Sequence, residues 1–214
     1  MRKISILLLL MMGSFGFAQT YQFDFLTKYM STNLQNKRSN EFVSYNNSDD
    51  FSYYLKLRKS DSDFTATLYD HERNLAHHFS VVESKVGNEI QFQFLYVNTS
   101  KLQNIIKHEN YRYEFSEISA DSPKIISLKI YASKRAKKPR VEKELTLKKA
   151  NKNLIQLYRS DWLHWSDSTY DLSKIGNYIV AESKEKFNNN ICQTNLKEYK
   201  NVDLKITIPK KLKF

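Results

Sequence analysis

Apolar and polar residues alternate along much of this chain, and this period of two restricts the fold more than any other feature of the sequence. Tyr21, Phe23 and Phe25 are separated by polar residues, and similar runs lie at 51–57, 64–68, 75–81 and 90–96. Successive side chains of a β-strand point to opposite faces, so this alternation predicts strands with one buried face. Polar connections between the runs, at 46–50, 60–63, 70–74 and 85–88, predict an antiparallel meander.

The second half of the chain adds further strands and two expected helices. Apolar runs at 126–132, 141–147, 154–158 and 202–208 are expected to form strands. Residues 100–108, with Ser100 as N-cap, and a segment from Asp171 to Phe187 have helical spacing of their apolar residues. We therefore predict a mainly β (α+β) fold with a single antiparallel meander sheet of about nine or ten strands and one or two packing helices. The sheet is expected to be strongly curved, or to form a half-barrel or a sandwich.

Residues 1–18 have the pattern of a signal peptide. A basic start is followed by an apolar run at 4–12 and by small residues before an expected cut after Ala18. The apolar run is too short to span a bilayer as a helix, and Gln19 rather than a cysteine follows the cut, so lipidation is not expected. We predict a periplasmic or secreted protein with one β-rich domain at 19–214 and no integral membrane span.

The composition argues against several classes of enzyme. The chain has 214 residues, a formal charge of +11, 4 glycines and 1 cysteine, Cys192. Scarce glycine argues against a P-loop, a dinucleotide fingerprint and a nucleophile elbow. His77 and His78 are expected to point to opposite faces of a strand, with His77 in the core. No histidine or cysteine spacing typical of zinc occurs, so we predict no metal site. Together with the missing glycine motifs, this leads us to predict no cofactor and no catalytic residues.

One segment is strongly basic. It joins two alternating apolar runs, so we expect a hairpin tip that presents Lys134, Arg135, Lys137, Lys138 and Arg140. A nucleic-acid site would interleave such cations with stacking aromatic residues, which this segment lacks. Anionic lipid or lipopolysaccharide is the expected partner, because each cation contributes about 1 kcal/mol near an anionic surface. The alternative interpretation is a solvated turn that only aids solubility.

Both tryptophans of the chain lie in one short segment. Asp161, Trp162, His164 and Trp165 are predicted to form a recognition loop whose rings stack on a sugar or a hydrophobic ligand. The alternative is a loop whose large rings cover one end of the core.

Two segments resemble exported proteins common in Bacteroidetes. They are residues 21–26 (YQFDFL) and 46–54 (NNSDDFSYY). The resemblance implies export and no known catalytic residues. More loosely, the expected order of meander strands and short helices is similar to LolA-like and LppX-like half-barrels, which hold acyl chains under a curved sheet; that likeness concerns the fold alone.

These features together favour an exported, non-catalytic binding module at the cell envelope, with an apolar or lipid-like small ligand or an envelope component as partner. A secreted hydrolase that uses sequence-distant carboxylates or His164 is the alternative. A structural envelope protein is the third hypothesis.

Overall fold

The computed structural model of the protein describes residues 18–60, 63–87, 89–102, 112–119, 123–162, 175–187 and 190–214. In these residues, eleven strands form one antiparallel sheet that is not closed into a barrel, and one short helix accompanies it. The predicted mainly β class and single antiparallel sheet are confirmed. The predicted signal segment, except for its last residue, lies outside the described residues.

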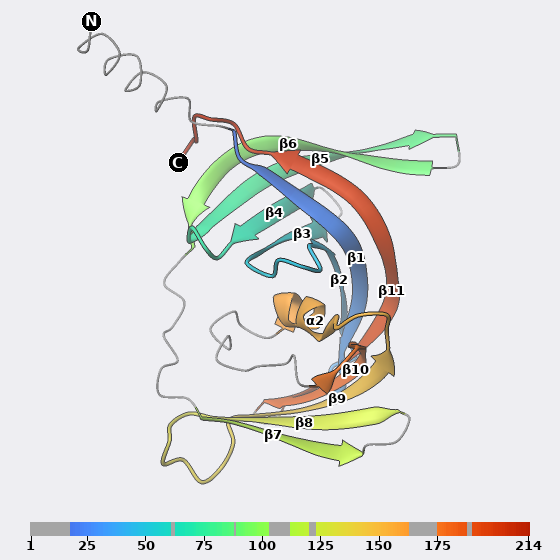
Figure 1. Ribbon diagram of the computed structural model, residues 1–214, viewed down its shortest axis with the longest axis vertical. Helices are drawn as coiled ribbons and strands as arrows, with labels where there is room; N and C mark the ends of the chain where they lie inside the picture. The colour runs from blue at the N-terminus through green and yellow to red at the C-terminus, as the bar shows by residue number, and fades with distance from the viewer. Residues whose placement is uncertain are drawn as a thin grey trace, which may run out of the picture.

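Two groups of strands flank a central pair. The first group is β2 (Ser39–Asn46), β3 (Tyr53–Lys59), β4 (Phe64–Asp70), β5 (Leu75–Val86) and β6 (Glu89–Lys101). The second group is β7 (Arg112–Ser119), β8 (Lys124–Tyr131), β9 (Val141–Lys149) and β10 (Tyr178–Phe187). The long strands β1 (Thr20–Asn33) and β11 (Asn190–Thr207) pair with each other between the groups. The spatial order is β6-β5-β4-β3-β2-β1-β11-β10-β9-β8-β7, and Figure 1 shows the sheet bending around helix α2 (Ile155–Trp162).

The two halves of the sheet bury opposite faces. Tyr21 and Phe23 of β1 belong to the core cluster of the first half. Beyond a register shift between Phe23 and Phe25, Phe25 and Tyr29 pack with the second half, where α2 lies. Leu26 still packs with the first cluster. The middle of β1 is therefore buried on both faces, which explains why one strand can serve two cores.

Aromatic rings fill the core of the first half. Phe94 lies 6.4 Å from Phe79 and 6.3 Å from Tyr45, centroid to centroid, in nearly perpendicular pairs. Such edge-to-face contacts are favourable beyond the area that they bury. The chain after β11 then reaches β6, where the Thr99 amide donates a hydrogen bond to the Lys213 carbonyl at 2.6 Å. This segment links β6 to the end of β11 across the first core.

Helix α2 closes the core of the second half. Ile155, Leu157 and Tyr158 of α2 are fully buried. The ring of Tyr158 lies 5.3 Å from that of Tyr29, whose hydroxyl donates to the Val180 carbonyl at 2.9 Å. The short helix thus ties β1 to β10 from inside the bend of the sheet. In the part of the chain that the structure describes, no helix has the length and apolar character needed to cross a bilayer.

Three predictions made from the sequence are wrong. Two concern elements in the second half of the sheet, and one concerns the end of β6. The expected strand at 154–158 is the start of α2, because a run of five mostly apolar residues fits either period and burial beneath the bent sheet decides it. Of the expected helix from Asp171 to Phe187, residues 178–187 instead form strand β10, since the flanking strands satisfy its backbone hydrogen bonds. Residues 171–174 lie outside the described residues. Ser100, expected to cap a helix at 100–108, lies within β6, and residues 103–108 of that expected helix lie outside the described residues.

Candidate functional site

The basic segment forms the turn between β8 and β9, as predicted. Lys134, Arg135, Lys137, Lys138 and Arg140 are all exposed. Residues 132–140 contain no aspartate or glutamate, so no acidic side chain within the turn neutralises these cations. The turn therefore presents five positive charges within seven consecutive residues at one end of the sheet.

Neighbouring strands hold this basic turn in place. The Arg140 amide donates to the Ile130 carbonyl at 2.7 Å, which closes the hairpin. Arg112 of β7 donates from Nη2 to the Ala136 carbonyl at 3.1 Å, and its guanidinium lies 3.7 Å from the centroid of the Tyr131 ring. These contacts restrain the backbone of the turn, while most of its cationic side chains extend into solvent.

A pocket opens where the sheet divides between β10 and β11. Residues 182–187 of β10 pair with both β11 and β9, whereas residues 178–180 pair with β9 and not with β11. A register shift next to Ala181 marks the point of division. Strand β11 beyond Asn195 pairs on one side only, with β1. The resulting pocket has a volume of about 490 Å³.

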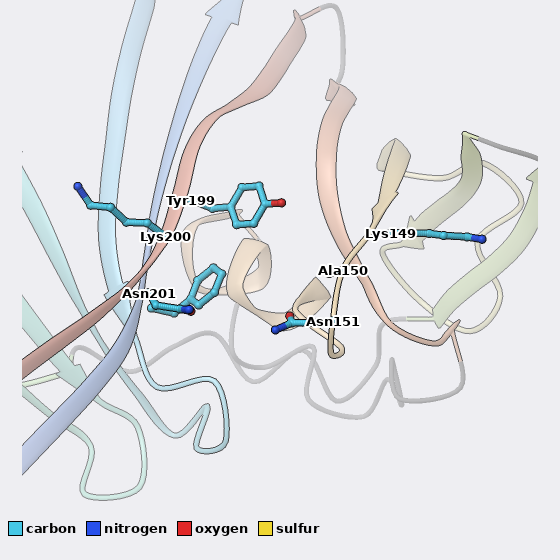
Figure 2. Close-up of a pocket in the computed structure, with 7 residues that line it drawn as sticks. Lys149, Ala150, Asn151, Tyr199, Lys200 and Asn201 are labelled. Carbon is cyan, nitrogen blue, oxygen red and sulfur yellow. The ribbon is translucent and has the colours of Figure 1, made fainter.

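The lining of the pocket combines rings, amides and cationic chain segments. It consists of Phe25, Lys149, Ala150, Asn151, Tyr199, Lys200 and Asn201. Figure 2 shows the Tyr199 ring and the Asn151 amide directed into the gap between β11 and the connection from β9 to α2, whereas the Lys149 and Lys200 side chains point away. Tyr199 stacks on Phe25 at 5.9 Å, and the Lys148 ammonium lies 5.5 Å from the centroid of the same ring. This lining suits a ligand with hydrogen-bonding groups better than a pure hydrocarbon.

Two carboxylates lie beside the pocket and contact the same lysine. Lys152 Nζ lies 3.2 Å from Asp49 and 3.6 Å from Asp24. Partial burial opposes ionisation of Asp24, but hydrogen bonds from the Ser48 hydroxyl and amide outweigh it, so the pKa of Asp24 lies below its ordinary value. Asp24 is therefore an ionised anchor for the loop at 47–51 rather than a proton donor at neutral pH.

A buried polar network lies at one end of the first core. Asp70 Oδ2 accepts hydrogen bonds from the Tyr21 hydroxyl at 2.5 Å and from Arg73 Nη1 at 3.0 Å. Burial raises the pKa of Tyr21 well above its ordinary value, and the Asp70 charge adds to this effect. Burial also opposes ionisation of Asp70, yet the hydrogen bonds from Tyr21 and Arg73 hold the pKa of Asp70 below its ordinary value.

The network continues through His77 to β6. His77 Nδ1 lies 2.8 Å from the Thr99 hydroxyl, which lies 2.7 Å from the Tyr96 hydroxyl. Burial lowers the pKa of the His77 imidazole, so the ring is neutral at pH 7. Asp70, His77 and Thr99 each have a relative exposure of 1%. A solute does not reach these groups in this conformation, and we interpret the network as structural.

The predicted Trp segment lies mostly beyond the described residues. Asp161 and Trp162 are in the last turn of α2, rather than in the loop that was expected, and the structure does not describe their side chains. His164 and Trp165 are outside the described residues. Whether these four residues form a ligand site stays a prediction.

Cysteine and metal chemistry find little support in the described ranges. Burial raises the pKa of the Cys192 thiol, and the Glu185 charge raises it further, so the thiol is protonated at neutral pH. No group of three or more potential metal ligands occurs among the described residues. His77 lies in the core, as predicted, and His78 points to the opposite face, where it contacts Thr67 and Ser100.

Sequence reasoning located the basic turn but missed the pocket and most of the buried network. The turn is visible because its five cations are consecutive or nearly so. The pocket combines residues from positions 25, 149–151 and 199–201, and no local motif connects them. Comparison with known proteins adds no relative: no protein-family model matches the chain, and no curated protein has a significant match to its sequence.

Proposed function

We propose that the protein is an exported, non-catalytic binding module that holds an anionic component of the cell envelope through the turn between β8 and β9. The observation that carries the proposal is the set of five exposed cations on that turn, with no acidic residue among them. Phosphate groups are the chemistry that anionic phospholipid and lipopolysaccharide share, and clustered lysine and arginine bind them by charge.

Two features make the turn a better candidate than the rest of the basic surface. Its backbone is restrained by the contacts from Arg112 and by the Arg140 hydrogen bond, so little backbone ordering is needed on binding. Elsewhere, lysines of the sheet are interspersed with acidic partners, as in the pairs Lys59–Glu83 and Lys28–Glu41. The turn, in contrast, contains no acidic residue of its own between residues 132 and 140.

The test compares two variants that lose the same five charges. In the first, Lys134, Arg135, Lys137, Lys138 and Arg140 are replaced by Gln. In the matched control, the exposed residues Arg38, Arg58, Lys85, Lys205 and Lys210 are replaced by Gln. Binding is measured by co-sedimentation with phosphatidylglycerol vesicles, with phosphatidylcholine vesicles and with lipopolysaccharide aggregates, over a series of salt concentrations.

The first variant should lose roughly a hundredfold or more in affinity for anionic vesicles at low salt, because each cation contributes about 1 kcal/mol. The control variant should lose much less. Binding by the unmodified protein should also weaken as salt screens the exposed charges. Equal losses in the two variants would mean that net charge, not the turn, determines binding. Comparison of the vesicle and lipopolysaccharide arms identifies which source of phosphate is preferred.

The pocket between β10 and β11 supports a second candidate, a site for a small hydroxylated or amphiphilic ligand. Amide side chains at Asn151 and Asn201, with the Tyr199 hydroxyl, offer donors and acceptors beside a stacked ring pair. A screen of oligosaccharides and glycolipid head groups by ligand-observed NMR tests it. Binding that survives both Tyr199→Ala and Asn151→Ala would place the ligand elsewhere.

A further inference from the structure

Strand β6 is an outermost strand of the sheet with an open edge. It pairs with β5 from Glu89 to Lys101, with a register shift at Val97, and it is the first strand in the spatial order. In the described part of the chain, no strand pairs with its other side, and the chain after β11 contacts only its end, through Thr99 and the Tyr96 hydroxyl. Residues 90–97 thus present a row of backbone donors and acceptors outward.

This edge lacks the side chains that normally prevent edge-to-edge pairing. No Asp, Glu, Lys, Arg or Pro occurs from residue 90 to residue 100. By contrast, β7 at the other end of the sheet carries Arg112, Glu114 and Glu117. The open stretch of β11 carries Lys197, Glu198, Lys200, Asp203 and Lys205. Charged residues and prolines on edges block association, so β6 differs from the other two open edges.

Exposed apolar side chains gather on the same hairpin. Val82, Ile90, Leu95 and Val97 are 44–58% exposed and are four of the seven large hydrophobic side chains described as exposed. Val82 pairs with Gln93 and Ser80 pairs with Leu95, so Val82 and Leu95 are diagonal neighbours on one face. Figure 1 shows the far end of the β5–β6 hairpin extending beyond the body of the sheet.

We infer that β6 pairs antiparallel with β6 of a second copy of the chain, so that two sheets join into one. Complementarity favours a second copy as the occupant. An uncharged, apolar edge is stabilised least by pairing with a charged strand. Among the described edges, only β6 itself is uncharged over such a length. The edge also allows two chains of formal charge +11 to approach without placing like charges opposite each other.

Symmetry determines the form of the complex. A two-fold axis perpendicular to the sheet makes two identical edges antiparallel. Such a contact uses the same edge of both copies, so no free copy of that edge is left for a third chain. Leu95 and Val97 of one copy then lie beside the same apolar strip of the other. The expected assembly is therefore a closed dimer with a continuous sheet, not an open-ended fibre.

The test uses sedimentation velocity of the mature chain over a wide range of concentration, with two designed variants. Leu95→Lys combined with Val97→Lys places cations opposite one another at the new interface. The matched control is Ile191→Lys, because Ile191 is 39% exposed and lies on β11 outside the hairpin. Amide hydrogen exchange of residues 90–97, measured at low and high concentration, reports whether the edge itself is covered.

The unmodified chain and the Ile191→Lys variant should form a dimer, and exchange at residues 90–97 should slow as the dimer forms. The double variant should weaken dimerisation roughly tenfold or more while it retains the circular dichroism of the folded sheet. A monomer at every concentration, growth beyond two copies, or a dimer that survives the double variant would each overturn the inference. A dimer that leaves exchange at residues 90–97 unchanged would do so as well.

Discussion

At the scale of single residues, the most consequential side chain is Asp70. It is buried beside the end of β4, yet it is ionised because Tyr21 and Arg73 donate hydrogen bonds to it. The same carboxylate accepts a bond at 3.4 Å from Gln19. Its contacts therefore tie the start of β1 to the turn between β4 and β5.

Replacing Asp70 by Asn should destabilise the fold by about 1–3 kcal/mol, because an amide cannot accept all the hydrogen bonds directed at the carboxylate. Urea unfolding followed by tyrosine fluorescence measures the change. Asp203→Asn is a suitable control, since Asp203 is exposed on β11. Equal effects of the two substitutions would contradict a stabilising role for the Asp70 contacts.

His77 should make stability depend on pH near neutrality. Burial holds the pKa of its folded form below the ordinary value of 6.5, so acidification protonates the unfolded chain before the folded one. Stability should therefore decrease as the pH falls from about 7.5 to 5.5. The variant His77→Gln should flatten this dependence, and His78→Gln should leave it in place. An unchanged slope in His77→Gln would show that another group is responsible.

Asp70 affects the stability of the fold in a separate, more acidic pH range. Because the pKa of its folded form is below the ordinary 3.8, its stabilising contribution is present above that value and is lost as the pH falls through the lowered pKa. The two groups therefore weaken the fold in sequence during acidification, His77 first.

At the scale of elements, helix α2 decides the packing of the second half. Ile155, Leu157 and Tyr158 face the bend of the sheet, and the amide of Leu154 donates to the Tyr178 carbonyl at 2.8 Å. The helix is short, so tertiary contacts rather than intrinsic propensity must stabilise it.

Leu157→Ala should consequently cost about 2–5 kcal/mol, since the side chain is fully buried and leaves a cavity. Thermal and urea unfolding measure the effect. The control is Gln156→Ala on the same helix, where the side chain is half-buried and the replacement has high helix propensity. Similar losses in both variants would mean that α2 is not packed as described.

The elements that sequence predicted well are the ones with a single buried face. Strands β3 to β6, β8 and β9 alternate clearly, whereas β2 buries Ser44, Tyr45 and Asn46 in succession. A strand buried on both faces loses its alternation, so its pattern carries little information. In β10, the register shift near Ala181 moves the apolar residues out of period two. Contacts between segments distant in sequence thus determine the secondary structure of the elements that were missed or wrongly predicted. Such contacts also determine the position of the pocket.

At the scale of the whole molecule, the basic turn and the β6 edge are separated by most of the sheet. The turn joins β8 and β9, and β6 is the outermost strand at the opposite end of the order. Substitutions in β6 should therefore leave the binding of one basic turn to anionic vesicles intact. The two proposals can fail independently.

Export should leave a folded protein that begins near Gln19. The structure is compatible with this cut, because β1 begins at Thr20 and the Gln19 carbonyl accepts a hydrogen bond from Ile208 at 2.8 Å. Mass spectrometry of protein recovered from the envelope or the medium should find an N-terminus at Gln19 or within a residue or two. An intact Met1 on such protein would contradict the prediction.

The pairing of β1 with β11 also constrains the order in which the chain can fold. Thr20 is opposite Thr207, so the central ladder joins residues that are up to 187 positions apart in the sequence. Pairing at such sequence separation is slow, because the entropy of loop closure opposes it before any contact stabilises it. Until β11 arrives, β1 has one unpaired edge and the aromatic side chains Tyr21 and Phe23 lack part of their core. A nascent chain stalled before residue 190 should therefore need a holding chaperone to avoid aggregation.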